Sequence, residues 1–276
     1  MKKETVNKFL ICICFIICMI PNALNAQSKK PLNMPLYDEE PYHFGLTIGY
    51  NQMMFSMNYK DGYQNIIHNP SELPDNIPGI SDIYTSSDFK VYDINTQIGH
   101  GFTVGIVGNL RLARHFDFRF TPSLSFGNRH ITYTLISLQE DPIEGVTNEK
   151  NFPDVIKSDT HSTFVELPLH IKYKSKRNYN SAAYILAGVN PKIDWAGKNK
   201  GYNKDTGNPI ELNVKRLDIA AEIGAGFDFY TGYFKLGIEL KMSYGLLDIA
   251  KDKDSMFSSS FDKLRNKGFQ LSFTFE

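Results

Sequence analysis

The sequence predicts an all-β fold, an eight-stranded antiparallel up-and-down transmembrane β-barrel of the outer-membrane type. Three observations support this prediction. Apolar and polar residues alternate with a period of two, the connections between these segments are short and long in turn, and the chain starts with an apolar segment typical of exported proteins. No later stretch is apolar enough for a membrane helix, so only a closed barrel could cross a bilayer.

The first 26 residues predict a cleaved secretory signal peptide. A lysine-rich start precedes an apolar run over residues 9–20, and Ala26 offers a small residue for cleavage. All three cysteines lie in that run, which excludes disulfides and cysteine metal sites from the rest of the chain. Residues 27–42 are the predicted periplasmic arm, whose prolines favour extended backbone, and residues 43–276 are the predicted barrel domain.

Charge and composition exclude two other classes of protein. Thirty basic side chains balance thirty acidic ones, so the chain lacks the strongly basic character of a nucleic-acid-binding domain. Aromatic residues make up 13% of the chain, which is too many for a disordered protein. We therefore expect a folded protein without a nucleic-acid partner.

The alternating segments give the predicted strands. In residues 234–246 every even position is apolar or aromatic, and charges occupy odd positions, which separates them onto two faces of a strand. In the first strand the apolar positions change parity after Tyr50, which predicts a β-bulge near Asn51 and Gln52. The predicted strands cover residues 43–59, 98–112, 116–135, 162–174, 181–192, 213–230, 233–247 and 266–276.

The lengths of the connections predict the orientation of the barrel. Short turns join strands two and three, four and five, and six and seven, whereas the other four connections, residues 60–97, 136–161, 193–212 and 248–265, are long. Outer-membrane barrels have short periplasmic turns and long extracellular loops, so both termini are predicted to be periplasmic. Apolar residues in the connection 60–97 favour a folded cap or a docking surface.

The two faces of the strands predict two sets of side chains. An eight-stranded barrel is just wide enough for side chains to fill it, so the polar face should form an internal charge network. Its predicted members are Arg119, Asp218, Glu222, Lys235, Glu239 and Lys241. The apolar face should meet lipid, with an aromatic girdle at the periplasmic ends of the strands. The predicted girdle consists of Phe116, Tyr173, Phe229, Phe234 and Phe275.

Two alternatives share this strand list. A soluble antiparallel sandwich would enclose the apolar face and expose the charges to solvent. A conducting pore would need an interior that side chains leave open. The face that meets the surroundings therefore distinguishes the membrane barrel from the sandwich.

The sequence offers few residues for chemistry. The seven histidines lack metal-binding spacing, and no G-x-S-x-G motif occurs. We therefore expect no enzyme activity, no cofactor and no metal. A lipid-acting enzyme would need serine, histidine and acid groups to converge near the outer rim, and Ser125, Ser162 and His161 are the candidates.

Several segments resemble PorT, called SprT in gliding relatives, the small outer-membrane barrel of the type IX secretion system of Bacteroidota. The similar segments are residues 31–38, 43–45, 101–112, 116–127 and 163–177. The arm and the segment Pro168–Lys174 are the more specific parts, because barrel strands are common to a broad family. The resemblance implies a non-catalytic accessory of protein secretion, with outer-membrane lipid and other secretion components of the envelope as partners. A structural or adhesive barrel outside secretion is the alternative.

Overall fold

The computed structural model describes residues 31–72, 87–140, 147–195, 214–251 and 259–276. The predicted signal peptide, residues 1–26, lies outside these ranges. No helix within them is long and apolar enough to cross a membrane. The elements are η2 (Tyr37–Glu39), β1 (Tyr42–Tyr59), η3 (Tyr63–Asn65), β2 (Ile67–His68), η4 (Pro70–Glu72), β3 (Phe89–Gln97), β4 (Gly99–Arg111), β5 (Phe116–Phe120), β6 (Ser123–Glu140), β7 (Thr147–Glu166), β8 (Leu169–Lys174), β9 (Ser181–Asp194), β10 (Leu217–Tyr230), β11 (Lys235–Gly245) and β12 (Phe261–Phe275).

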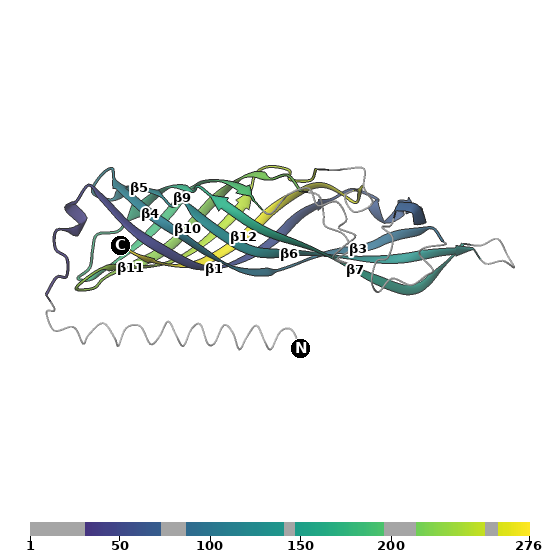
Figure 1. Ribbon diagram of the computed structural model, residues 1–276, viewed down its shortest axis with the longest axis horizontal. Coiled ribbons are helices and arrows are strands. Elements are labelled where there is room, and N and C mark those ends of the chain that lie inside the picture. The colour runs from purple at the N-terminus through teal and green to yellow at the C-terminus, as the bar shows by residue number, and fades with distance from the viewer. Residues whose placement is uncertain (1–30, 73–86, 141–146, 196–213, 252–258) are drawn as a thin grey trace.

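The strands close into an antiparallel ring of eight positions, which confirms the predicted barrel (Figure 1). Around the ring β1 pairs with β4, and β4 pairs with both β5 and β6. β5 pairs with β8, and β6 pairs with β7. The strands β9, β10, β11 and β12 then follow in order. The ring closes where β12 returns to β1, with Leu46 opposite Phe275. Each neighbour therefore supplies the backbone hydrogen bonds that a strand needs inside lipid.

Two of the eight positions are each shared by two strand segments. The predicted strand 116–135 is divided into β5 and β6 at Pro122, and the next one is divided into β7 and β8 at Pro168. A proline cannot donate a backbone hydrogen bond, so the ladder is interrupted at both points. The proline carbonyls still accept hydrogen bonds, from the amides of Ile106 and Thr121 respectively, which keeps the wall of the barrel continuous.

A sheet extends from the ring at the end opposite to Glu276, which we call the far end (Figure 1). It consists of β3 and the distal parts of β6 and β7. The prediction of long loops was wrong here, because β3 lies in the connection 60–97 and the β6–β7 hairpin occupies most of the connection 136–161. These segments extend beyond the closed ring and lack the strong period-two pattern that identified the other strands.

The structure contradicts the β-bulge predicted near Asn51 and Gln52. The register between β1 and β12 is continuous from Leu46 to Asn58, and that between β1 and β4 is continuous from Tyr42 to Met53. The side chains keep alternating, but the interior changes from polar to apolar along β1. The inward residue Asn51 is therefore followed by inward Phe55, which is only 2% exposed.

The apolar face of the ring points outward, as the barrel prediction requires. On β1 the side chains of Phe44, Leu46, Ile48 and Tyr50 are exposed, while the intervening Thr47 is buried. The same alternation continues around the ring, and β10 repeats it over its whole length. This arrangement excludes the soluble sandwich, because the charged side chains of the strands are enclosed and the apolar ones are exposed.

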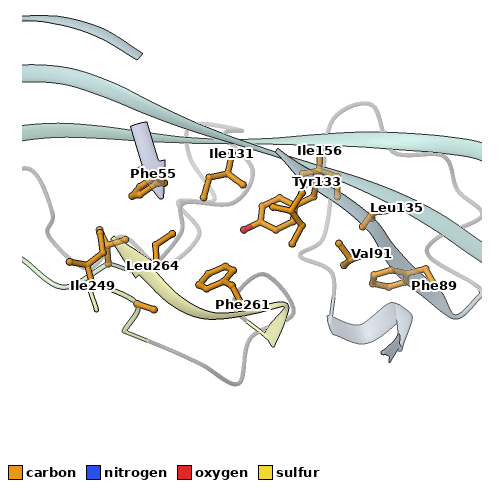
Figure 2. Close-up of a cluster of buried hydrophobic side chains, with 13 residues drawn as sticks. Phe55, Phe89, Val91, Ile131, Tyr133, Leu135, Ile156, Ile249, Phe261 and Leu264 are labelled. Atoms are coloured by element: carbon orange, nitrogen blue, oxygen red, sulfur yellow. The ribbon is translucent and has the colours of Figure 1, made fainter. Parts of the chain in front are cut away.

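The far end of the interior holds an apolar core instead of charges (Figure 2). Its residues come from β1, β3, β6, β7, β12 and the connections that precede β10 and β12. They are Phe55, Phe89, Val91, Ile94, Ile131, Tyr133, Leu135, Ile156, Val214, Ile249, Ala250, Phe261 and Leu264. The connection 60–97 thus contributes to a folded cap through β3.

Candidate functional site

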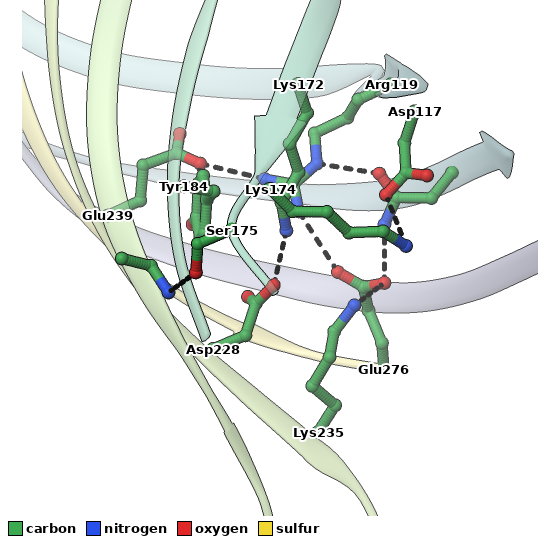
Figure 3. Close-up of polar contacts among 12 residues, drawn as sticks. Asp117, Arg119, Lys172, Lys174, Ser175, Tyr184, Asp228, Lys235, Glu239 and Glu276 are labelled. Carbon is green, nitrogen blue, oxygen red and sulfur yellow. Dashed lines mark hydrogen bonds and ion pairs between the residues drawn. The ribbon is translucent and has the colours of Figure 1, made fainter. Parts of the chain in front are cut away.

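The half of the interior nearest Glu276, which we call the arm end, contains a network of buried charges (Figure 3). Arg119 on β5 lies at its centre and is 3% exposed. Its guanidinium donates to Glu239 on β11 at 2.8 Å and to Glu276 at 3.2 Å. Lys172 on β8 reaches Asp228 on β10 at 2.6 Å. These pairs cross the barrel and join strands that are not neighbours in the ring.

Glu276, directly after β12, connects this network to both sides of the barrel. Its carboxylate accepts hydrogen bonds from Lys235 at 2.8 Å, from Asn109 at 2.5 Å and from the hydroxyl of Tyr37 at 3.3 Å. Burial alone would raise the pKa of Glu276, but Lys235 and Arg119 outweigh it and hold this pKa well below its ordinary value. Glu276 therefore stays ionised as the anchor of the network.

A second group of charges lies deeper in the barrel. Glu222 on β10 contacts the ammonium of Lys241 at 2.9 Å and the ring of His170 at 2.8 Å, and it accepts from the side-chain amide of Asn190 at 2.8 Å. Asp218, on the same strand, accepts from Asn266 at 2.7 Å. Each buried carboxylate thus has a donor, which offsets the cost of removing it from water.

Arg129 on β6 marks the boundary between the charged and apolar halves. It is 1% exposed and donates to Asp194 at 3.1 Å. Its guanidinium carbon also lies 4.5 Å from the ring centre of Phe55 and 5.1 Å from that of Phe164. Such cation–π contacts let one side chain face both environments.

All six predicted network residues are placed in the interior and are buried, and the structure pairs Arg119 with Glu239 and Lys241 with Glu222. Four further members lie outside the predicted set of six, and they are Lys172, Asp228, Arg129 and Glu276. Lys172 and Asp228 occupy polar positions of the period-two pattern, which was the available signal. Glu276 carried the same signal, because it falls within the predicted strand 266–276 and keeps the inward parity of Ser272 and Thr274.

The five predicted girdle residues point outward at the arm end. Each is between 39% and 45% exposed; four lie at or beside strand ends next to the short turns, and Phe275 is the last residue of β12. Phe116 and Tyr173 are paired across β5 and β8 with ring centres 5.1 Å apart. Phe234 and Phe275 lie 5.9 Å apart, so the rings form neighbouring pairs at one level.

The described part of the arm packs across the arm end of the barrel. Tyr37 of η2 stacks on His43 with ring centres 3.8 Å apart and meets Tyr230 edge-on at 5.8 Å. Burial and the nearby Glu276 raise the pKa of Tyr37 well above its ordinary value, so its hydroxyl remains a donor. The predicted extended backbone is thus interrupted by a turn of 3₁₀-helix that places Tyr37 under the network.

Arg177, in the turn between β8 and β9, fastens the arm. It donates to the carbonyl oxygens of Asn33 and Met34 and lies over the ring of Tyr230 at 3.7 Å. Asp38 accepts from the hydroxyl of Tyr230 at 2.9 Å. The arm, the β8–β9 turn and the end of β10 therefore form one surface.

The structure does not assemble the candidate Ser–His–acid site. Ser125 and Ser162 are buried in the interior, where Ser125 contacts Thr103 at 2.7 Å and Ser162 accepts from Arg129. His161 is exposed and contacts Asn128 at 2.8 Å. Across the described ranges, no group of three or more His, Cys, Asp and Glu side chains is arranged to hold a metal ion.

A comparison with known protein families agrees with this architecture. A family model described as "Outer membrane protein beta-barrel domain" matches residues 25–251. One similar solved structure is Ail, the attachment invasion locus protein of Yersinia pestis, in complex with the heparin analogue sucrose octasulfate. It is 12% identical with a TM-score of 0.35, and the match covers 86% of this chain and 98% of that one. No curated protein matches the sequence.

Proposed function

We propose that this chain, which belongs to the outer membrane protein β-barrel domain family, is a non-catalytic accessory of type IX protein secretion. It would act by docking on other envelope components through its arm and loops. The proposal starts from an outer-membrane barrel in contact with lipid and adds the secretion role, the absence of catalysis and the protein partners.

One observation carries the secretion role: the two segments that most specifically resemble PorT meet at the arm end. Residues 31–38 pack against the β8–β9 turn that follows Pro168–Lys174. Lys174 and Arg177 approach the carboxylate of Asp38 at 3.6 and 3.9 Å. A shared surface built from both segments is what a partner that recognises this family would contact.

The filled interior supports a docking role over conduction. Ion pairs cross the arm end, and the apolar core occupies the far end. A cavity beside Arg129 and Lys241 has a volume of only about 40 Å³, which suits a few water molecules and not a transported solute. A barrel of this kind would contribute its surface to a translocon rather than its lumen.

Gene deletion tests the role in secretion. We expect deletion to stop export of type IX cargo and wild-type protein to restore it. Arg177→Ala should restore export only partly, because it removes the hydrogen bonds that fasten the arm. Lys60→Ala, an exposed change at the far end, is the matched control and should restore export fully. Cargo in the culture medium is the measurement, and unchanged export after deletion would refute the role.

The proposed orientation places the arm end in the periplasm and the far end outside the cell. The natural protein has no cysteine after Cys18, so single introduced cysteines report on one site each. In intact cells an impermeant maleimide should label Asp61→Cys, at the far end, and not Tyr233→Cys, whose position is 95% exposed at the arm end. Tyr233→Cys should react only after the outer membrane is opened, and the reverse pattern would invert the topology.

A structural or adhesive barrel remains the second candidate, and the sheet beyond the ring favours it. β6 and β7 stay paired from Ser123 and Glu166 to Glu140 and Thr147, far past the membrane-sized ring. A chain without residues 139–152 would keep the ring and shorten this sheet. Loss of surface binding with normal cargo export in that variant would favour adhesion, and the opposite result would favour secretion.

A further inference from the structure

A cavity of about 260 Å³ lies at the arm end, outside the charge network. It is formed by the arm, the end of β4, the β4–β5 turn, the β8–β9 turn and parts of β9 and β10. Its charged and titratable lining consists of Asp38, Glu39, Arg111, Arg114, His115, Lys174, Lys176, Arg177 and Tyr230. The cavity shares Asp38, Lys174 and Arg177 with the proposed docking surface, but its exposed cations Arg114 and Lys176 take no part in the secretion proposal or in the internal network.

The walls of the cavity are held by hydrogen bonds between the two turns. The amide of Lys174 donates to the carbonyl of His115 at 2.9 Å, and the ring of His115 contacts the carbonyl of Lys174 at 3.1 Å. Arg111 donates to the carbonyl of Glu39 at 2.9 Å, which adds the arm as a third wall. The cationic side chains are therefore presented by a fixed backbone.

The lining carries an excess of positive charge. Five lysine and arginine side chains face two carboxylates, of which Asp38 already contacts Tyr230 and lies 3.6 Å from Lys174. Arg114 and Lys176 are exposed, and among the described residues neither side chain has an ion pair or a hydrogen bond. Charges of one sign that line a concave surface concentrate ions of the opposite sign.

The position of the cavity indicates which anions would reach its positive charges. His115 directly precedes Phe116, and Lys174 directly follows Tyr173, and both of these rings face outward at the level of the girdle. Aromatic belts of membrane proteins sit at the level of the lipid headgroups. A cationic cavity at this level faces lipid phosphates before it faces soluble molecules.

We propose that this cavity binds the phosphate of an anionic phospholipid headgroup in the leaflet that surrounds the arm end. Arg114 and Lys176 contact the phosphate, and Lys174 and Arg111 shape the site from behind. The bound lipid would fasten the arm and both turns to the membrane surface. This inference is independent of the secretion role and requires only that the barrel is inserted in lipid.

Native mass spectrometry of the purified full-length protein tests the site. Phosphatidylglycerol, phosphatidylcholine, inorganic phosphate and an octaglutamate peptide are offered separately. We expect selective retention of phosphatidylglycerol. The double variant Arg114→Ala/Lys176→Ala should weaken it roughly 30-fold, since each cation near a membrane surface contributes about a factor of five.

The matched control is Lys60→Ala/Lys263→Ala, which removes two exposed lysines at the far end. It should retain phosphatidylglycerol within about two-fold of the wild type, because those charges are remote from the cavity. Equal retention by both double variants would overturn the proposal. Equal affinity for inorganic phosphate or for phosphatidylcholine would overturn the lipid-phosphate assignment, and tighter binding of octaglutamate would assign the cavity to an acidic peptide instead. Heat-dependent gel mobility verifies that each variant is folded.

Discussion

Replacing Arg119 with methionine is expected to destabilise the barrel by about 3–5 kcal/mol, the usual cost of removing one partner of a buried ion pair. The change takes the guanidinium away from Glu239 and Glu276 and leaves both carboxylates buried with fewer donors. It also removes the hydrogen bond to Asn109 at 2.9 Å. Urea-dependent unfolding from phospholipid vesicles measures the change in free energy.

Two further variants separate lost pairing from lost side-chain volume. Lys60→Met removes a cation at an exposed position of the far end, away from the network and the membrane-facing cavity, and should alter the free energy of unfolding by no more than about 0.5 kcal/mol. Arg119→Met/Glu239→Gln should be more stable than Arg119→Met alone, because it removes one of the stranded charges. If Arg119→Met and the wild type have the same urea midpoint of unfolding, the interior network contributes no net stability.

The sequence contained enough information to predict the ring and its two faces. Lipid outside and charge inside impose opposite requirements on successive residues, so the alternation over Phe234–Leu246 predicts a strand with one apolar and one charged face. The same contrast placed Lys235, Glu239 and Lys241 on the inner face before any pairing was known. Alternating loop lengths then supplied the up-and-down order.

The parts that sequence reasoning missed are those where this contrast is absent. Glu276 is an exception, because it continues the inward parity of Ser272 and Thr274 and the pattern therefore places it in the interior, although the predicted network did not include it. The strands of the extended sheet lie beyond the closed ring and lose the periodic signal. At Phe55 the inside of the barrel is itself apolar, which imitates a change of parity and led to the incorrect β-bulge.

Replacing Leu264 with alanine tests whether the far end of the barrel has a core like that of a soluble protein. Leu264 on β12 is fully buried among the apolar residues shown in Figure 2. Its truncation should cost about 2–5 kcal/mol, because both the transfer free energy and the packing around the new cavity are lost. The free energy is measured by unfolding from vesicles, and protease added at the far end reports local opening.

Leu271→Ala is the matched control, since it truncates the same residue type on the same strand but on the outward face, where Leu271 is 39% exposed. Fluid lipid fills the space left there, so only the transfer free energy of about 2 kcal/mol is lost and no cavity remains. Leu264→Ala should also increase cleavage at the far end, whereas Leu271→Ala should not. Equal destabilisation without local cleavage would mean that the far end is no better packed than the lipid surface. A larger effect at Leu264 would mean that the cap is held by its own core, and that the loops and the extended sheet are presented to partners on a rigid base.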